Sequence, residues 1–303
     1  MFILRLPRSF IGIFLTLLTI IFGVAAGLMV KKIGDQAALV TVLMYRFLLS
    51  TPLLALLAFL VRGKQFLQIN ARRTLMVRVL FGCVTMTCWF ISIRLLPLGQ
   101  ATALLQSSVI FVTLLSPLLL GERIGIWRWS AVVVGMFGIV LLTNPFEGGF
   151  SANVIYGVAG AVSGAGLSIL LRRLGKADNP FSVAVWYNGT GAVLLTSLAF
   201  VLPGDNVGVT QPVMVDLLIL GGVATALQLS VTSAYKFSEA VVIASMRYLQ
   251  IPAAGLVAYL IFAEVMTVTE IAGGVVVIAS CLVIAWREMV RSRRLSGAES
   301  TPL

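Results

Sequence analysis

The chain has 303 residues, of which 59% are apolar and 11% charged, and its mean hydropathy is +1.05. A soluble domain carries roughly 25% charged residues, so this composition cannot cover a water-facing surface and indicates a membrane protein. The net charge of +11 is scattered between apolar runs, which excludes the basic face of a nucleic-acid-binding protein. Histidine is absent, the cysteines lack metal-site spacing and no phosphate-binding loop occurs. We therefore expect no enzyme, no metal and no cofactor.

Ten apolar runs follow one another along the chain, and each is long enough to cross a bilayer as a helix. Turn sequences such as Asn144-Pro145 and Asn179-Pro180 separate them. The first run exceeds the 7–15 residues of a signal-peptide core, so we expect it to stay as the first helix. The predicted fold is an all-α membrane protein of ten transmembrane helices. The runs lie at residues 10–30, 38–61, 74–93, 98–120, 127–143, 153–171, 181–202, 213–235, 239–262 and 267–286.

The distribution of Lys and Arg predicts the orientation of these helices. If the N-terminus is cytoplasmic, 16 basic residues fall in cytoplasmic segments, 3 fall in periplasmic segments, and Arg46, Arg78 and Arg247 lie within apolar runs. This bias predicts that both termini face the cytoplasm of a bacterial-type inner membrane. The basic tail at residues 287–303 is expected to help set the orientation and to contact anionic lipid.

The two halves of the chain match each other. Residues 82–101 align with residues 221–240 at an offset of 139, and residues 31–34 (Lys-Lys-Ile-Gly) align with residues 172–175 (Arg-Arg-Leu-Gly) at an offset of 141. Each half has five predicted helices, and because five is odd the second half must enter the membrane from the opposite side. Such inverted repeats are typical of secondary transporters, whose sites lie near the midplane between the repeats.

Three sequence features resemble the EamA family of the drug/metabolite transporter superfamily. They are the passage ending in LLLGERI, its second-half counterpart ending in IFAEVMT, and an arginine within MYRFLLS. The resemblance divides the chain into five-helix repeats at residues 10–143 and 153–286. It implies transport of small metabolites such as amino acids, often as export. The lone acids of the two passages, Glu122 and Glu264, are expected to cap neighbouring helices.

One departure from the resembling family concerns the fourth apolar run. Relatives often carry a proline midway along the fourth helix, matching Pro252 in the ninth. Here Ile110 stands near that place, and proline occurs at Pro117 instead. We therefore expect the two halves to bend differently.

Two arginines lie deep within predicted spans. Arg46 and Arg247 each stand about eight residues into an apolar run, where a charge costs roughly 2.5–3.5 kcal/mol. If both face a cavity, its potential is positive and favours an anionic or zwitterionic solute, because Arg grips carboxylate or phosphate in a bidentate manner. The alternative is that either side chain extends to the membrane interface.

Polar and aromatic residues at comparable depth are further candidates for binding a solute. Trp89 and Gln228 coincide when the halves are aligned. Amides can hydrogen-bond a solute and rings can stack on it, although each of these residues could equally serve helix packing. The remaining candidates are Gln106, Tyr45, Trp186, Tyr187, Asn188, Tyr235 and Tyr248.

Two functions fit these observations. The first is a carrier of anionic or zwitterionic metabolites that works by alternating access. The second is a lipid-handling protein or flippase of the same fold, in which the arginines would hold a phosphate headgroup. The partners expected are a small-molecule substrate and membrane lipid. Coupling by protons, exchange or facilitated diffusion stays open, and stripes of small residues such as Gly160 and Gly164 fit a monomer or a homodimer.

The inverted repeat makes a prediction about topology. Reporter fusions at residues 150 and 205 should read as periplasmic, and fusions at residues 70 and 176 should read as cytoplasmic. A reversed pattern in either half would overturn the inverted repeat.

Overall fold

The computed structural model describes residues 8–120, 125–143, 151–202, 208–237, 243 and 246–299, and these are helical apart from short connections. Eight of the described helices are long and apolar enough to cross a membrane, and residues 129–143 and 250–262 form shorter apolar helices. The all-α fold of ten spans is therefore confirmed. The helices are α1 (Arg8–Ile33), α2 (Leu39–Arg62), α3 (Arg72–Leu95), α4 (Leu98–Gln106), α5 (Ser108–Leu120), α6 (Ile126–Thr143), α7 (Val154–Ala177), α8 (Pro180–Val201), α9 (Gln211–Phe237), α11 (Gln250–Phe262) and α12 (Val268–Glu299).

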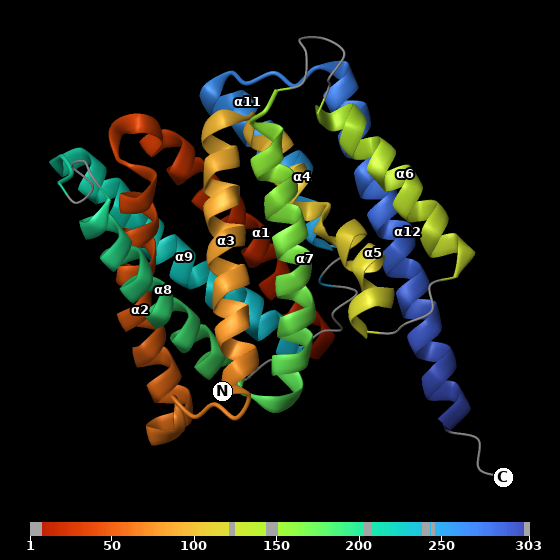
Figure 1. Cartoon of the computed structure of the whole chain (residues 1–303), viewed down its shortest axis with the longest axis horizontal. Coiled ribbons are helices and arrows are strands. Elements are labelled where there is room, and N and C mark those ends of the chain that lie inside the picture. The colour runs from red at the N-terminus through yellow and green to blue at the C-terminus, as the bar shows by residue number, and fades with distance from the viewer. Residues whose placement is uncertain are drawn as a thin grey trace, which may run out of the picture.

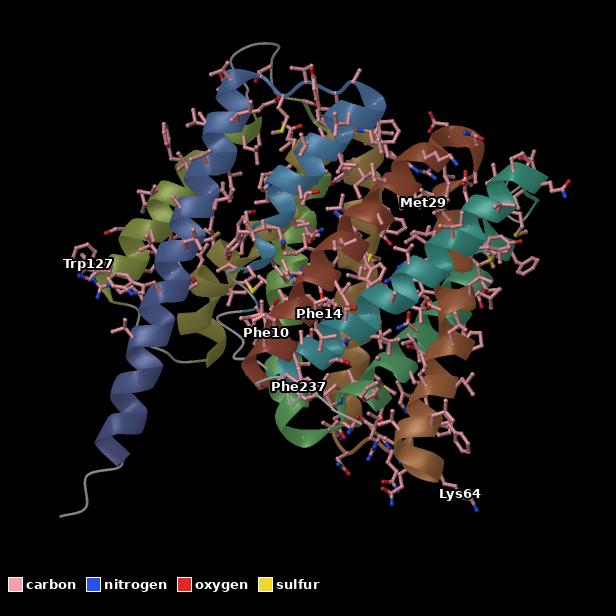
Figure 2. The ribbon with its side chains drawn as sticks, turned by 180° about the vertical axis from the view of Figure 1, so that it is seen from behind. Phe10, Phe14, Met29, Lys64, Trp127 and Phe237 are labelled. Carbon is pink, nitrogen blue, oxygen red and sulfur yellow. The ribbon has the colours of Figure 1, made fainter. Side chains whose placement is uncertain are left out.

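The outer surface of the bundle is apolar. Helices satisfy their own backbone hydrogen bonds, which lipid cannot do for them, so large apolar side chains can point outward, as Figure 2 shows. Leu60 and Val133 are 69% and 66% exposed. Trp127 lies at the end of α6, and the Arg287 guanidinium carbon lies 4.6 Å from the centre of its ring. Such an aromatic–cation pair at a span end is typical of the membrane interface.

The two halves begin at opposite edges of the bundle. In Figure 1, α1 starts towards the lower edge and α7 towards the upper one, and both chain halves then cross repeatedly between the edges. Phe10 lies low and Met29 high along α1 in Figure 2. Across the halves, α1 packs on α9 and α3 on α7, while α2 packs on α8, α4 on α11 and α6 on α12. The pairs α2–α8 and α6–α12 each join a helix to its own counterpart in the repeat, and α4 and α11 belong to the corresponding fourth and ninth spans.

The pair α6–α12 depends on glycine. A Cβ atom at Gly273 would collide with the backbone of Leu142, and one at Gly138 would lie 2.8 Å from Val276 Cγ1. The Ser280 hydroxyl donates a hydrogen bond across this seam to the carbonyl oxygen of Ala131. Without a hydrophobic force between helices in lipid, such close backbone contact supplies much of the association energy.

Two spans are interrupted midway. The ninth run breaks at Tyr248–Leu249, just before Pro252, which can donate no backbone hydrogen bond. The fourth run breaks at Ser107 although no proline lies there, and the Ser107 hydroxyl donates to the Leu104 carbonyl oxygen (2.6 Å). The two halves were expected to bend differently because of the missing proline, yet both are interrupted at corresponding depths.

Polar contacts tie the helix ends together at the upper edge. Lys31 forms an ion pair with Glu264 and donates a hydrogen bond to the Leu96 carbonyl oxygen (2.9 Å). Glu264 also accepts a hydrogen bond from the Leu98 backbone N–H (2.9 Å) and so caps the start of α4, as expected. Glu122, its expected counterpart, lies outside the described residues.

The α6–α12 seam gives a matched pair of substitutions. Gly273→Ala should lower the thermal midpoint of the purified protein by several degrees, because backbone cannot move aside cheaply and overpacking costs about 1–3 kcal/mol. Gly274→Ala should leave it nearly unchanged, since its Cβ would lie 3.9 Å from Leu142 Cδ1, an ordinary contact. Equal midpoints for the two variants would contradict the close contact at Gly273.

Candidate substrate site

Two buried arginines and one tyrosine from three different helices meet inside the bundle. Arg46 of α2 and Arg78 of α3 are each 4% exposed, and Tyr187 of α8 is 3% exposed. The Arg78 guanidinium carbon lies 3.7 Å from the centre of the Tyr187 ring. Arg46 interacts with the Tyr187 hydroxyl, and it lies close enough to Arg78 for the two positive charges to repel each other. We call Arg46, Arg78 and Tyr187 the arginine cluster.

Glycines allow this cluster to close. A Cβ atom at Gly82 on α3 would lie 2.7 Å from Tyr187 Cε2, and one at Gly191 on α8 would lie 2.7 Å from Phe47 Cδ1. Because both positions lack a side chain, the rings of Phe47 and Tyr187 can pack edge to face with their centres 5.2 Å apart. Residues of α2, α3 and α8 together therefore fix the positions of the aromatic rings beside the arginines.

The cluster lies where the two halves of the chain meet. Arg46 and Tyr187 are separated by 141 positions, the offset that relates the two repeats near residue 31. Gln106 and Arg247 have the same separation, and Gln106 Nε2 donates a hydrogen bond to the Arg247 carbonyl oxygen (2.9 Å). A residue that contacts its own counterpart must lie close to the axis relating the repeats. Inverted-repeat transporters place their sites in this region.

The positive charge of the cluster is not balanced by the described part of the chain. Neither Arg46 nor Arg78 forms an ion pair with a described acidic residue. Nη1 of Arg46, and Nε and Nη1 of Arg78, have no hydrogen-bond partner there. The contact with an aromatic face stabilises each buried arginine by about 2 kcal/mol. This is less than the desolvation free energy of several kcal/mol that burial of each charge costs. The described acids lie near helix ends or in the C-terminal part of α12: Asp35, Asp178, Asp216, Glu264, Glu270, Glu288 and Glu299.

Asn188 lies beside the arginine cluster. It is 1% exposed, and its Nδ2 donates to the Ala184 carbonyl oxygen (2.9 Å). The Ser50 hydroxyl lies within hydrogen-bond distance of both Asn188 Oδ1 (3.3 Å) and the Arg46 carbonyl oxygen. Asn188 therefore helps to join α2 to α8 at the depth of Arg46.

A second polar group lies at the interruptions of the fourth and ninth spans. Gln106 is 7% exposed at the end of α4, and Arg247 is half-buried just before α11. Nε of Arg247 has no hydrogen-bond partner among the described residues. Tyr248 is buried next to Arg247 and interacts with Cys281 of α12. No described contact joins Arg247 to Arg46, so the two arginines predicted to share a cavity contact different helices.

The other residues predicted from the sequence lie elsewhere. Trp89 is 6% exposed on α3, with its ring centre 5.5 Å from that of Phe90, and its indole N–H has no partner in the described residues. Tyr45 on α2 and Gln228 on α9 are half-buried. No described contact joins these three to the arginine cluster.

The structure brings Tyr187, one of the residues that we selected from the sequence, together with Arg78, which we had not selected. Arg78 follows Arg72 and Arg73 along α3, so by position it looked like one more interfacial arginine. The signal that could have found it was its place within an apolar run, which it shares with only Arg46 and Arg247.

Comparisons with known proteins agree with this architecture. A profile of the EamA-like transporter family matches residues 10–144 and again residues 152–286. The chain belongs to the EamA-like transporter family. It is therefore a multi-pass membrane transporter and not an enzyme, and the family resemblance seen in the sequence is confirmed.

Relatives of this EamA transporter carry different solutes. A pseudopaline exporter of Pseudomonas aeruginosa is 28% identical over 70% of this chain and 74% of its own. An S-adenosylmethionine uptake transporter of Rickettsia bellii is 27% identical over 92% and 94%. A riboflavin transporter of Vibrio cholerae is 28% identical over 72% and 73%. A solved crystal structure covers 95% of this chain and 98% of its own with a TM-score of 0.61 at 18% identity, which supports the fold.

The unbalanced charge predicts how removing it changes stability. In ligand-free detergent solution, Arg78→Met should keep or raise the thermal midpoint, because relief from desolvation and repulsion outweighs the lost aromatic contact. As a comparison, Asp178→Ala should lower it, since Asp178 accepts hydrogen bonds from the Asn70 and Ala71 backbone N–H groups (2.6 and 3.0 Å). A drop with Arg78→Met as large as that with Asp178→Ala would make Arg78 a structural anchor.

Proposed function

We propose that this protein is a secondary transporter that exports small anionic or zwitterionic metabolites, such as amino acids, across the bacterial inner membrane by alternating access. The observation that carries the proposal is the arginine cluster, with its two buried guanidinium groups and no acidic partner among the described residues. An anion that enters between Arg46 and Arg78 would balance both charges. Their unpartnered N–H groups would donate to its oxygen atoms.

The chemistry of the cluster favours a carboxylate or phosphate over a cation. A cationic solute would add to the repulsion between the two arginines, while an anion would replace repulsion by attraction in a region of low dielectric constant. The Tyr187 ring and the Asn188 amide border the same space and could select the rest of the solute. Gln106 and Arg247 remain a second candidate contact, at the interruptions of the two spans.

Export is the proposed direction, and the pseudopaline exporter of Pseudomonas aeruginosa supports it. The uptake transporter of Rickettsia bellii, which matches more of the chain, shows that the fold also serves import. Direction therefore has its own experiment, counterflow in vesicles of known orientation. Accumulation from the cytoplasmic face outward would support export, and the reverse would overturn that part of the proposal.

The substrate class can be tested by a thermal-shift screen of purified protein with anionic, zwitterionic and cationic metabolites and with dispersed lipid. A ligand at about 100 times its dissociation constant stabilises the folded protein by about 2.7 kcal/mol. We expect carboxylate or phosphate compounds to raise the midpoint of the wild type and to have little effect on Arg46→Gln or Arg78→Gln. The same compounds should drive counterflow in the wild type.

Two further variants sharpen this experiment. Arg73→Gln removes the same charge from an exposed position on α3 and should respond as the wild type does. Arg247→Gln distinguishes the two polar groups: if it alone loses the response, the anion binds at the span interruptions and not at the arginine cluster. A response to cations and not to anions would overturn the proposed substrate class. A response to lipid that is lost in Arg46→Gln and Arg78→Gln, with no response to soluble anions, would favour lipid handling.

A further inference from the structure

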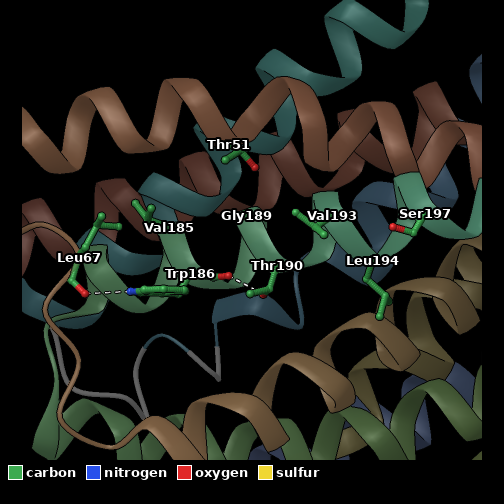
Figure 3. Close-up of a pocket in the computed structure, with 9 residues that line it drawn as sticks. All are labelled: Thr51, Leu67, Val185, Trp186, Gly189, Thr190, Val193, Leu194 and Ser197. Carbon is green, nitrogen blue, oxygen red and sulfur yellow. Dashed lines mark hydrogen bonds between the residues drawn. The ribbon is translucent and has the colours of Figure 1, made fainter.

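The outer face of α8 carries a groove that the transport proposal does not use. It has a volume of about 720 Å³ and opens beside α2 and the segment that joins α2 to α3 (Figure 3). The α8 residues that line it recur on one face of the helix, from Val185 to Ser197. Twelve residues of helix correspond to about 18 Å, slightly more than half of a hydrocarbon core of about 30 Å. The lining comprises Thr51, Leu67, Val185, Trp186, Gly189, Thr190, Val193, Leu194 and Ser197.

The walls of this groove suit a hydrocarbon chain. The Thr51 hydroxyl is bonded to the Phe47 carbonyl oxygen (2.7 Å) and the Thr190 hydroxyl to that of Trp186, so both are satisfied within their own helices. The indole N–H of Trp186 donates to the Leu67 carbonyl oxygen (2.9 Å). A polar solute would find few open hydrogen-bonding groups here, whereas an acyl chain needs none.

The lower end of the groove is fixed to a basic segment. Residues 63–71 join α2 to α3, and hydrogen bonds hold them against α8 and the turn before it. Trp186 donates to Leu67, and Asp178 accepts from two backbone N–H groups of the segment. Just before the segment, Arg62 at the end of α2 donates to the Ser182 hydroxyl (2.5 Å). The segment therefore stands at the mouth of the groove.

The charge at this mouth is positive. Lys64, Arg72 and Arg73 are exposed at the same edge of the bundle, and Figure 2 shows Lys64 reaching away from the end of α2. Asp178 is engaged by the backbone of the segment. Of the other described acids, those that follow α1, begin α9, or lie between α11 and the first turn of α12 stand at the opposite edge, and Glu288 and Glu299 lie in the C-terminal part of α12. The positive-inside bias makes the basic edge cytoplasmic, and the cytoplasmic leaflet carries the anionic lipids.

We infer that this groove binds an anionic phospholipid of the cytoplasmic leaflet. One acyl chain lies along α8 between Val185 and Ser197, and the phosphate headgroup lies among Lys64, Arg72 and Arg73. The lipid is a bound component that covers the seam between α2 and α8, behind the arginine cluster. The inference is independent of the transported solute, because it uses none of the side chains proposed to bind that solute.

Native mass spectrometry of the full-length protein tests this site. The protein is incubated in detergent with phosphatidylglycerol or phosphatidylcholine of identical chains, and retained lipid is counted. The wild type should retain phosphatidylglycerol preferentially. Arg72→Gln together with Arg73→Gln should reduce that preference roughly ten- to thirtyfold, because each basic residue near the membrane surface contributes about a fivefold effect.

A pair of matched tryptophan substitutions tests the groove itself. Val193→Trp fills it and should lower retention of both lipids, whereas Val133→Trp, at a similarly exposed position on α6 (66% against 69%), should not. Both side chains point outward, so folding should survive, and the thermal midpoints check this.

The basic tail provides the control for the headgroup. Arg291→Gln together with Arg293→Gln removes two charges from the cytoplasmic tail, and it should lower the preference for phosphatidylglycerol much less than Arg72→Gln together with Arg73→Gln does. Equal retention of the two lipids by the wild type would overturn the inference. So would loss of retention in the tail variant but not in the Arg72/Arg73 variant, or equal effects of the two tryptophans.

Discussion

A guanidinium group inside a bilayer needs an anion, an aromatic face or water beside it, and much of this bundle is arranged around that need. Arg46 and Arg78 receive the faces of Phe47 and Tyr187. These rings can stand there because Gly82 and Gly191 leave room for them. What the rings cannot supply is negative charge. Within the part of the chain that the structure describes, no acidic side chain pairs with these arginines, so an anion bound at the seam between the halves would balance their charge.

The two halves meet through pairs of corresponding helices, but they are not equivalent. α2 packs extensively along α9. In the repeat, α8 corresponds to α2 and α3 corresponds to α9, and the pair α8–α3 makes much less contact. In inverted-repeat transporters, the two repeats exchange such arrangements, and a cavity that was open on one side of the membrane then opens on the other side. At the upper edge, the ion pair of Lys31 and Glu264 is only partly shielded from solvent, with side chains 15% and 20% exposed. If the proposed alternating access opens this edge, water can replace the pair.

Hydropathy and the internal offset were enough to predict the ten spans and the duplication, because they depend on composition along the chain, and the family came from the resemblance of three short motifs. The depth of Arg46 could be predicted in the same way. The neighbours of Arg46 could not, since they depend on how each helix is rotated and which helices touch. Arg247 has the depth expected of a partner for Arg46 but contacts α4, while Arg78 approaches Arg46 through Tyr187. The break at Ser107 was missed because no proline marks it.

The contact between Arg46 and Tyr187 also bears on the origin of the chain. The two residues occupy corresponding positions in the repeats and meet at the axis between them. In an ancestor built from two identical five-helix chains, this place would hold the same residue twice, and two arginines would repel while two tyrosines would carry no positive charge. Joining the copies in one gene removed that restriction. One copy could then keep the charge and the other could acquire the ring that accommodates it.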